Sequence, residues 1–272
     1  MLLKRLVGVV TVRRSIAVQS FGYRRWLPLG RPEVLVENLD RWGADEILLQ
    51  CIDRSAQDLG PDFALLDRIG RLGLSTPLTY AGGIRHVQDA VLVVQRAADR
   101  VAVDALLRDN LPQVRAISQR LGAQAVVAAL PLSLTRGDSG PPALAWRDYR
   151  RAVCTPLPAQ LPALLREGLV SEAMLIDWQN EGTPGAFSMP LAQAFARLQL
   201  PFIAFGGLSK SEQLRQLLHQ PHCVAVAMGN FLSWREHAVQ AAKNQLQGLP
   251  MRPPAWQGLA PLNEGAEAAH GR

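Results

Sequence analysis

Two glycine pairs, Gly82-Gly83 and Gly206-Gly207, follow short apolar runs and precede segments with helical periodicity. Because glycine has no Cβ, the backbone can approach an anion closely there, and the N-terminus of the following helix supplies free N–H groups. Gly229-Asn230 follows the last apolar run and completes the second of these sites. The pattern predicts phosphate or anion binding. The alternative is that the glycines only form tight turns between strands and helices.

The first glycine pair has a less suitable neighbour for an anion. Asp104-Ala105 follows the next apolar run along the chain. A carboxylate pointed at a phosphate repels it at close range. We therefore expect the site at Gly82-Gly83 to bind anions less well than the site at Gly206-Gly207.

Composition and spacing argue against several other classes of site. Cys51, Cys154 and Cys223 stand far apart, and no two of the five histidines have metal-ligand spacing, so we expect reduced thiols, no metal and no cofactor.

The formal net charge of +6 is spread along the chain, which favours anionic small molecules or an acidic partner over nucleic acid. The first apolar run is too short to span a bilayer and lacks a cleavage site, so we expect a cytoplasmic protein without membrane insertion.

Short apolar runs alternate with longer amphipathic segments along the whole chain. The predicted strands cover residues 5–12, 45–51, 77–81, 99–103, 124–130, 172–177, 201–205 and 222–228. The predicted helices cover residues 32–42, 61–72, 86–97, 110–121, 158–168, 189–198, 209–219 and 233–246. Near-continuous apolar strands are typical of a parallel sheet covered by helices. Eight strands alternating with eight helices favour an α/β fold of the (β/α)8 TIM-barrel type over an open sheet.

An internal repeat supports this prediction. The segment 77–84 matches the segment 201–208 at a spacing of 124 residues, and 45–49 matches 171–175 at a spacing of 126. Two duplicated half-barrels, each of four strand–helix units, would produce this register. We therefore expect one barrel over residues 1–247, built from two similar halves.

Two stretches interrupt the alternation of strands and helices. Residues 13–31, rich in arginine and aromatic side chains, and residues 131–157, rich in Gly, Pro and Ser, are expected to be long loops. Loops of this length in a compact domain usually act as lids or partner surfaces. Residues 248–272 are rich in Pro, Ala and Glu and are expected to form an extension with a disordered end.

Ordered motifs run from residue 1 to about residue 245. They are Met1-Leu-x-Lys-Arg, Gly43-Ala-Asp-Glu-Ile, Leu78-Thr-x-x-Gly-Gly-Ile-Arg, Ala98-Asp-x-Val, Gly122-Ala-Gln-Ala-Val-Val, Glu181-Gly-Thr and Ile203-Ala-x-Gly-Gly. Together they resemble the HisF-type cyclase subunit of imidazole glycerol phosphate synthase, a lyase of histidine biosynthesis. The resemblance implies a barrel that takes ammonia from a class-I, HisH-like glutaminase at the N-terminal face of its strands. The ammonia passes through the core to the C-terminal face, where two aspartates carry out acid–base cyclisation and cleavage.

The catalytic positions of that family are changed in this chain. The aspartate expected in the first strand falls on Thr11, and the aspartate expected in the fifth strand falls on Pro131. The lysine expected shortly after the first strand falls on Gln19. Neither threonine nor proline transfers a proton near neutral pH. We therefore expect that no catalytic residue of the cyclase reaction is retained.

The opposite end of the predicted barrel keeps the family pattern. Four charged residues stand at the beginnings of predicted strands and match the family's ring at the ammonia entrance: Arg5, Glu46, Arg100 and Glu172. Asp99 matches a residue that meets the glutaminase. The resemblance thus implies an ammonia gate. The alternative is a structural salt-bridge network, since the N-terminal face of a barrel usually serves stability.

The segment 19–33 resembles the first loop of a branch of this family that is associated with sugar amidation for surface polysaccharides. That branch supplies ammonia to a separate amidotransferase and lacks the aspartate of the first strand. The chain departs even from this branch at Cys51, at Pro131 and in the segment Trp178-Gln-Asn.

Three hypotheses follow for the function of the chain. The first is a non-cyclising subunit that binds a glutaminase and conducts ammonia to an acceptor enzyme, which would be a sugar-modifying amidotransferase at the C-terminal face. The second is an authentic cyclase with relocated acid–base groups, for which Asp53, Asp104, Asp177 and Glu181 are candidates. The third is a scaffold barrel without ammonia flux.

Overall fold

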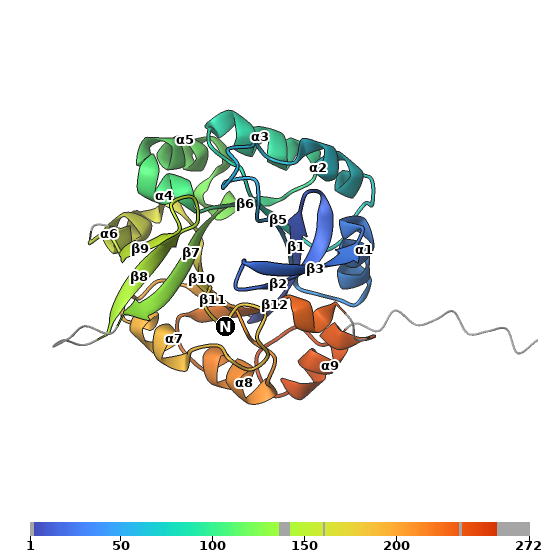
Figure 1. Cartoon of the computed structure of the whole chain (residues 1–272). Coiled ribbons are helices and arrows are strands. Elements are labelled where there is room, and N and C mark those ends of the chain that lie inside the picture. Colours follow the sequence, from blue (N-terminus) through green and yellow to red (C-terminus); the bar gives the residue numbers. More distant parts are fainter. Residues whose placement is uncertain (1–2, 136–141, 160, 234–235, 255–272) are drawn as a thin grey trace, which may run out of the picture.

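Eight parallel strands close into a ring at the centre of the molecule (Figure 1). In ring order they are β1 (Arg5–Arg13), β4 (Glu46–Cys51), β5 (Leu78–Ala81), β6 (Arg100–Val103), β7 (Val126–Thr135), β10 (Glu172–Asp177), β11 (Phe202–Phe205) and β12 (Cys223–Met228). The pairing of β7 with β10 and of β12 with β1 closes the sheet on itself. The predicted (β/α)8 barrel is thus confirmed by this computed structural model, which describes residues 3–135, 142–159, 161–233 and 236–254.

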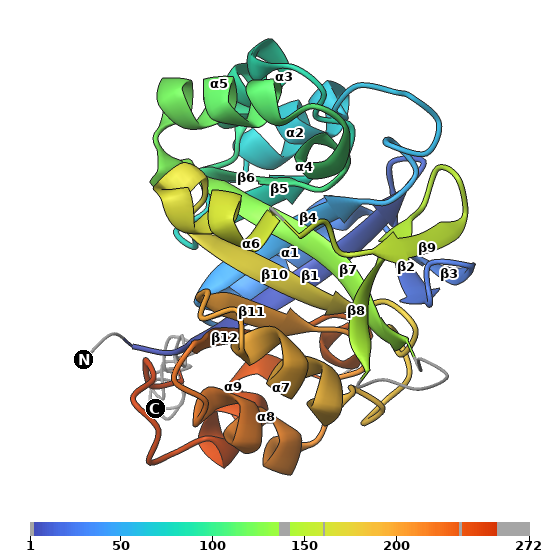
Figure 2. The same cartoon turned by 90° about the vertical axis from the view of Figure 1, so that its left-hand side faces the viewer.

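Helices surround the ring on its outer side (Figures 1 and 2). They are α1 (Pro32–Arg41), α2 (Phe63–Gly70), α3 (Val87–Arg96), α4 (Ala105–Asp109), α5 (Leu111–Leu121), α6 (Leu161–Leu164), α7 (Met189–Ala196), α8 (Ser211–Leu218) and α9 (Ala238–Gln245). Several begin where the sequence supplies a cap: the side chain of Asp62 accepts from the N–H of Leu65, and that of Ser188 accepts from Leu191. Within the described residues, no helix is long and apolar enough to cross a membrane.

Alternation along the strands divides the apolar side chains into two clusters. On β1, Leu6 and Val10 face outward and pack against the helices, whereas Val7 and Val9 face the barrel interior. The interior cluster includes small side chains from several strands, namely Ala81, Ala102, Ala129, Ala225 and Ala227. The outer cluster is the larger of the two and forms the main core. The interior is therefore lined by apolar side chains, in which these alanines lie beside larger residues such as Met174 and Phe205.

The two expected long loops are β-hairpins instead. Within residues 13–31, β2 (Ile16–Phe21) pairs with both β1 and β3 (Arg25–Gly30). In the second stretch, β7 continues to Thr135 and pairs with β8 (Ala143–Asp148), which pairs with β9 (Val153–Pro156). Residues 136–141 lie outside the described part of the chain.

The hairpin strands could not be predicted from the sequence, because the residues that form them lack the usual pattern of a strand. β2 is buried on both faces at its centre, and β3 is mostly exposed, so neither shows a clean alternation of apolar and polar residues. Pro131 lies inside β7, where proline argues against a strand. It is tolerated because β6 pairs only with residues 126–128 of β7 and ends before Pro131.

The glycine pairs occupy equivalent places in the two half-barrels. A Cβ on Gly82 would clash with the carbonyl oxygen of Cys51 at the end of β4, and a Cβ on Gly206 would clash with that of Asp177 at the end of β10. Both glycines have positive φ, +134° and +112°. The same close contact is thus repeated at the spacing of the internal repeat. It supplies a structural reason for glycine at these positions.

The chain returns to the start of β1 after α9. The backbone N–H of Lys4 donates to the carbonyl oxygen of Pro250 at 2.7 Å, and Lys4 forms a bridge with Met251. The expected disordered end of the extension falls on residues 255–272, which lie outside the described part of the chain.

Candidate functional sites at the two ends of the barrel

Four charged side chains meet at the N-terminal end of the barrel. Nη1 of Arg5 lies 2.7 Å from Oε2 of Glu46, and the other guanidinium nitrogen of Arg5 bonds to Glu172. Nη1 of Arg100 lies 3.1 Å from Oε1 of Glu46, and its Nη2 lies 2.6 Å from Oε1 of Glu172. The four predicted gate residues therefore form a closed ring of alternating charge, which we call the charge ring.

Further hydrogen bonds support the charge ring. Thr79 on β5 donates its hydroxyl to Oε1 of Glu46 at 2.6 Å, and Arg100 also donates to the hydroxyl of Ser171 at 2.6 Å. Burial lowers the pKa of Arg5, but the charges of Glu172 and Glu46 outweigh burial and raise the pKa overall. Buried charges are tolerated when they are fully paired, and this ring meets that condition.

Asp99 lies next to the charge ring, immediately before β6. Its side chain is exposed, and one carboxylate oxygen accepts from the backbone N–H of Leu78 at 2.8 Å. The second oxygen has no hydrogen-bond or salt-bridge partner among the described residues. Asp99 thus both holds the start of β5 and presents a charge at the N-terminal face.

At the C-terminal end, the β2–β3 hairpin lies over the barrel mouth (Figure 1). The side-chain amide of Asn230 donates to the carbonyl oxygen of Ser20 at 2.7 Å, and its oxygen accepts from the N–H of Ser20 at 3.2 Å. The carboxylate of Glu181 accepts from the hydroxyl of Ser20 at 2.9 Å and from the N–H of Tyr23 at 3.2 Å. Asn230 and Glu181 together form a clamp that fixes the hairpin.

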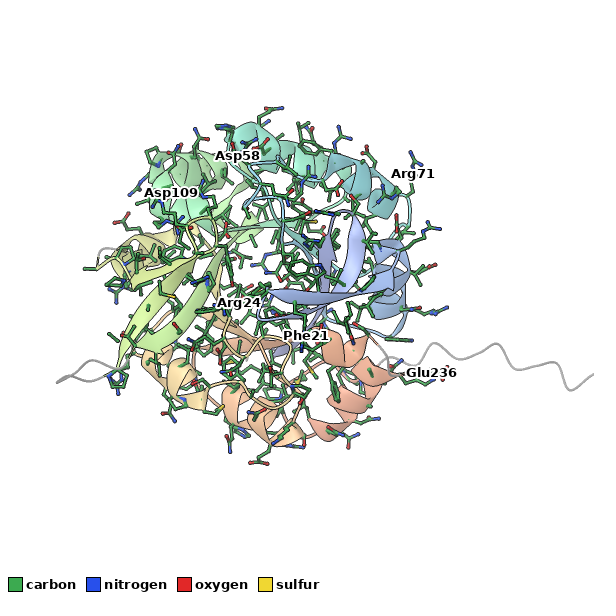
Figure 3. All side chains as sticks on the ribbon, viewed as in Figure 1. Phe21, Arg24, Asp58, Arg71, Asp109 and Glu236 are labelled. Atoms are coloured by element: carbon green, nitrogen blue, oxygen red, sulfur yellow. The ribbon has the colours of Figure 1, made fainter. Side chains whose placement is uncertain are left out.

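Aromatic side chains join the two hairpins across the mouth. The rings of Tyr23 and Tyr149 meet edge to face, with centroids 5.3 Å apart. The guanidinium groups of Arg24 and Arg147 both lie over the indole of Trp178, at 5.7 and 4.8 Å from a ring centroid. Figure 3 shows Arg24 over the middle of the barrel. The sequence had not indicated Tyr149 as a site residue, because nothing local marks its contact with Tyr23.

The clamp leads to a first prediction. Asn230→Ala leaves both backbone groups of Ser20 without their partner, which costs about 1–3 kcal/mol locally. We expect the amides of residues 16–30 to exchange with deuterium roughly tenfold faster or more, with a global melting temperature close to that of the wild type. Asn38→Ala is the control, because it removes only an exposed contact with Arg41. Unchanged exchange in Asn230→Ala would show that the clamp does not hold the hairpin.

Two cavities lie beneath the hairpins. We call the first, of about 230 Å³, the glycine cavity; it lies between the ends of β11 and β12 and the loop after β10. We call the second, of about 160 Å³, the tyrosine cavity; it lies at the ends of β4, β5, β6 and β7. The tyrosine cavity also borders Ile176 on β10, so it extends across the boundary between the two half-barrels.

Three of the six predicted anion-binding residues line the glycine cavity. Gly207, Gly229 and Asn230 line it, and Gly206 precedes them without lining it. The backbone N–H groups of Gly207 and Ser209 have no hydrogen-bond acceptor among the described residues. The structure thus brings together backbone donors that can bind an anion, although the side chain of Asn230 is engaged with Ser20.

The first glycine pair is divided between two environments. Gly82 lines the tyrosine cavity, whereas Gly83 packs against the loop before α2. The N–H of Gly83 already donates to the hydroxyl of Ser55 at 3.2 Å. Fewer free donors are therefore available here than at the glycine cavity.

The positions of the cyclase aspartates lie at the C-terminal end of the barrel. Thr11 is buried near the end of β1, and Pro131 lines the tyrosine cavity opposite Ile176 in the strand register. Gln19 lines the glycine cavity. Neither strand thus presents a titratable group at these positions.

Three of the four alternative acids are used in loop structure. Asp53 accepts from the N–H of Arg14 at 2.8 Å, and Asp177 accepts from Asn180 and from the N–H of Ser188, both at 2.8 Å. Glu181 belongs to the clamp. Asp104, at the end of β6, is the remaining candidate and lines the tyrosine cavity. Among the described residues, no group of three or more His, Cys, Asp or Glu side chains is placed to hold a metal.

The environment of Asp104 leads to a second prediction. Burial raises its pKa above the ordinary 3.8, although the N–H of Ala105 and the charge of Arg108 oppose this. The folded protein therefore holds the proton more tightly than the unfolded chain, and stability falls as the pH rises from about 3.8 through the raised pKa. We expect Asp104→Asn to be more stable than the wild type at about pH 7, and this gain to disappear below about pH 4. Urea unfolding at several pH values measures it; a gain independent of pH would contradict it.

Comparison with known proteins agrees with the barrel. The model of the family described as "Histidine biosynthesis protein" matches residues 28–237. A protein of Vibrio vulnificus (strain YJ016), named "Putative imidazole glycerol phosphate synthase subunit hisF2", is 23% identical over 265 residues. The match covers 91% of this chain and 89% of that protein.

Proposed function

Because the chain belongs to the histidine biosynthesis protein family, we propose that it is a barrel subunit that conducts ammonia and has lost the cyclase reaction. It would receive ammonia from a class-I glutaminase at its N-terminal face and deliver it to an acceptor enzyme at its C-terminal face. The observation that carries this proposal is the contrast between the two ends. The charge ring is complete, whereas Thr11 and Pro131 stand at the positions of the catalytic aspartates.

The N-terminal face supports docking of a glutaminase. The charge ring surrounds the start of the barrel interior, and its arginines are partly exposed, with 27% and 14% of the side-chain surface accessible. Exposed Asp99 adjoins the ring. Behind the ring, the interior is lined by apolar side chains such as Leu48 and Val127. Apolar walls favour the passage of neutral ammonia over hydrated ions.

The C-terminal face supports docking of an acceptor enzyme with an acidic surface. Several arginines of the hairpins have no acidic salt-bridge partner within the described ranges, namely Arg13, Arg14, Arg24, Arg25 and Arg147. Unneutralised positive charge at one face attracts an acidic partner or substrate. We assign the acceptor to sugar amidation for surface polysaccharide, on the resemblance of residues 19–33. The glycine cavity would hold an anionic group of the ligand or of the partner.

A coupled assay tests the proposal. The chain is mixed with a class-I glutaminase and the acceptor amidotransferase encoded beside it, and glutamine-dependent amidation is compared with amidation driven by added ammonium. Arg5→Ala and Glu46→Ala are expected to reduce the glutamine-dependent rate about tenfold or more and to spare the ammonium-dependent rate. Arg100→Lys retains the charge and serves as control. Circular dichroism shows whether each variant is folded at the assay temperature. Unchanged glutamine-dependent amidation in both alanine variants would refute the conduit.

The position of Asp104 favours one alternative, an authentic cyclase with a relocated acid–base group. Complementation of a histidine auxotroph that lacks the cyclase subunit decides between the two. The conduit proposal expects no growth without histidine. Growth that depends on Asp104 would favour the cyclase instead.

A further inference from the structure

The tyrosine cavity is a pocket bounded by strand residues on one side and by hairpin residues on the other. Its floor is made of Ala81, Ala102 and Ala129 from three neighbouring strands. Tyr23 and Tyr149, one from each hairpin, contact each other and also line the cavity. The cavity has a volume of about 160 Å³, and a water molecule in the liquid occupies about 30 Å³. It therefore has room for a ligand of a few heavy atoms.

The charge that lines this cavity is negative. Asp104 is the charged residue of the lining, and no lysine, arginine or histidine is among the described residues that line it. One oxygen of Asp104 accepts from the N–H of Ala105, and the other has no hydrogen-bond partner among the described residues. The nearby arginines are committed elsewhere, since Arg108 and Arg150 both pair with Asp109. The carboxylate thus lacks a partner on the side of the cavity.

Other polar groups around the cavity add hydrogen-bond acceptors. The hydroxyl of Tyr149 is buried and has no partner in the part of the chain that the structure describes. The hydroxyl of Tyr23 donates to Oε1 of Gln50 at 3.3 Å, which leaves its oxygen free to accept. Burial raises the pKa of both tyrosines well above the ordinary value of 10.0, so the hydroxyls stay neutral. Aromatic rings further stabilise a cation placed against their faces.

We propose that the tyrosine cavity is a binding site for a small cation with N–H donors, ammonium or a short primary alkylammonium, with Asp104 as its counter-charge. A buried carboxylate without a partner is costly, and a bound cation offsets that cost. The ammonium group presents several donors, which match the free oxygens of Asp104, Tyr23 and Tyr149. A phosphate would instead meet the charge of Asp104 at close range. The proposal stands on the cavity and does not require that the chain conducts ammonia.

Titration with methylammonium tests this proposal on the full-length chain. [13C]Methylammonium chloride is followed by NMR at constant ionic strength, and ammonium chloride is then added as competitor. We expect saturable binding that ammonium displaces. Asp104→Asn is expected to weaken it about tenfold or more, because it removes a charge-assisted hydrogen bond. Asp58→Asn changes an exposed carboxylate paired with Arg85 and is expected to leave binding unchanged.

A second measurement locates the cation. Crystals soaked in rubidium chloride, whose cation is close to ammonium in size, are expected to show an anomalous peak beside Asp104. Tyr149→Phe, which removes the unpartnered hydroxyl but keeps the ring, is expected to weaken methylammonium binding less than Asp104→Asn does. Lack of saturable binding in the folded wild type, equal affinity in Asp104→Asn, or inorganic phosphate bound in this cavity would each overturn the proposal.

Discussion

Replacing Glu46 by glutamine is expected to lower the free energy of unfolding by about 3–5 kcal/mol. Glu46 is 3% exposed and accepts hydrogen bonds from Arg5, Arg100 and Thr79. In Glu46→Gln, the two partly buried guanidinium groups of Arg5 and Arg100 share the single remaining carboxylate of Glu172, and one positive charge is left without a partner. Urea unfolding followed by circular dichroism measures the change.

An exposed ion pair provides the control for this experiment. Glu167 pairs with Arg115 at 3.1 Å, and both side chains are about half exposed, at 50% and 46%. Glu167→Gln is expected to cost less than about 1 kcal/mol, since solvent screens surface pairs. Equal losses in the two variants would mean that the charge ring does not act as a buried network. A larger loss in Glu46→Gln shows that the ring contributes to stability, whatever its role in ammonia transfer.

Replacing Lys243 by methionine is the second change with a large expected effect. Nζ of Lys243 lies 2.7 Å from Oδ1 of Asp45, and both side chains are almost completely buried. Oδ2 of Asp45 accepts from the N–H of Leu6 at 2.8 Å, so the pair connects α9 to the start of β1. Lys243→Met leaves a buried carboxylate without its counter-charge, which costs about 3–5 kcal/mol. Urea unfolding measures the loss, and faster hydrogen exchange in α9 locates it.

A double variant separates the loss of the pair from the loss of packing. In Asp45→Asn/Lys243→Met the charge is absent, while the asparagine oxygen can still accept from Leu6. We expect the double variant to be more stable than Lys243→Met alone, because no buried charge is left unpaired. A double variant that is no more stable than the single variant would indicate that the methionine itself disrupts the packing.

The arrangement of the N-terminal face could be predicted from the sequence. Each residue of the charge ring stands at the beginning of an apolar run, and parallel strands of a barrel bring their beginnings to one face. Arg5 and Glu172 are 167 positions apart in the chain, yet the strand register alone places them together. The fold and the ring geometry therefore followed from periodicity and from the resemblance to known barrels.

The arrangement of the C-terminal face could not be predicted in the same way. The clamp joins Asn230 to Ser20 across 210 positions through a side chain and a backbone group, and no periodicity marks such a contact. The meeting of Tyr23 with Tyr149 depends on how far two hairpins bend over the mouth. A hairpin strand that is buried on both faces, or mostly exposed to solvent, shows no alternation of apolar and polar residues in its sequence. Sequence patterns thus predicted the barrel strands better than the hairpins at the C-terminal face.

The repeated glycine turns have an evolutionary consequence. Gly82 and Gly206 make the same contact in the two halves of the barrel, but one half presents free backbone donors and the other presents the carboxylate of Asp104. An ancestral gene that duplicated and fused would have begun with two identical copies of this turn. Selection could then act on one copy while the other continued to serve its original purpose. Different polar groups at corresponding sites of one molecule are the outcome expected of such divergence, and they require no change in the scaffold.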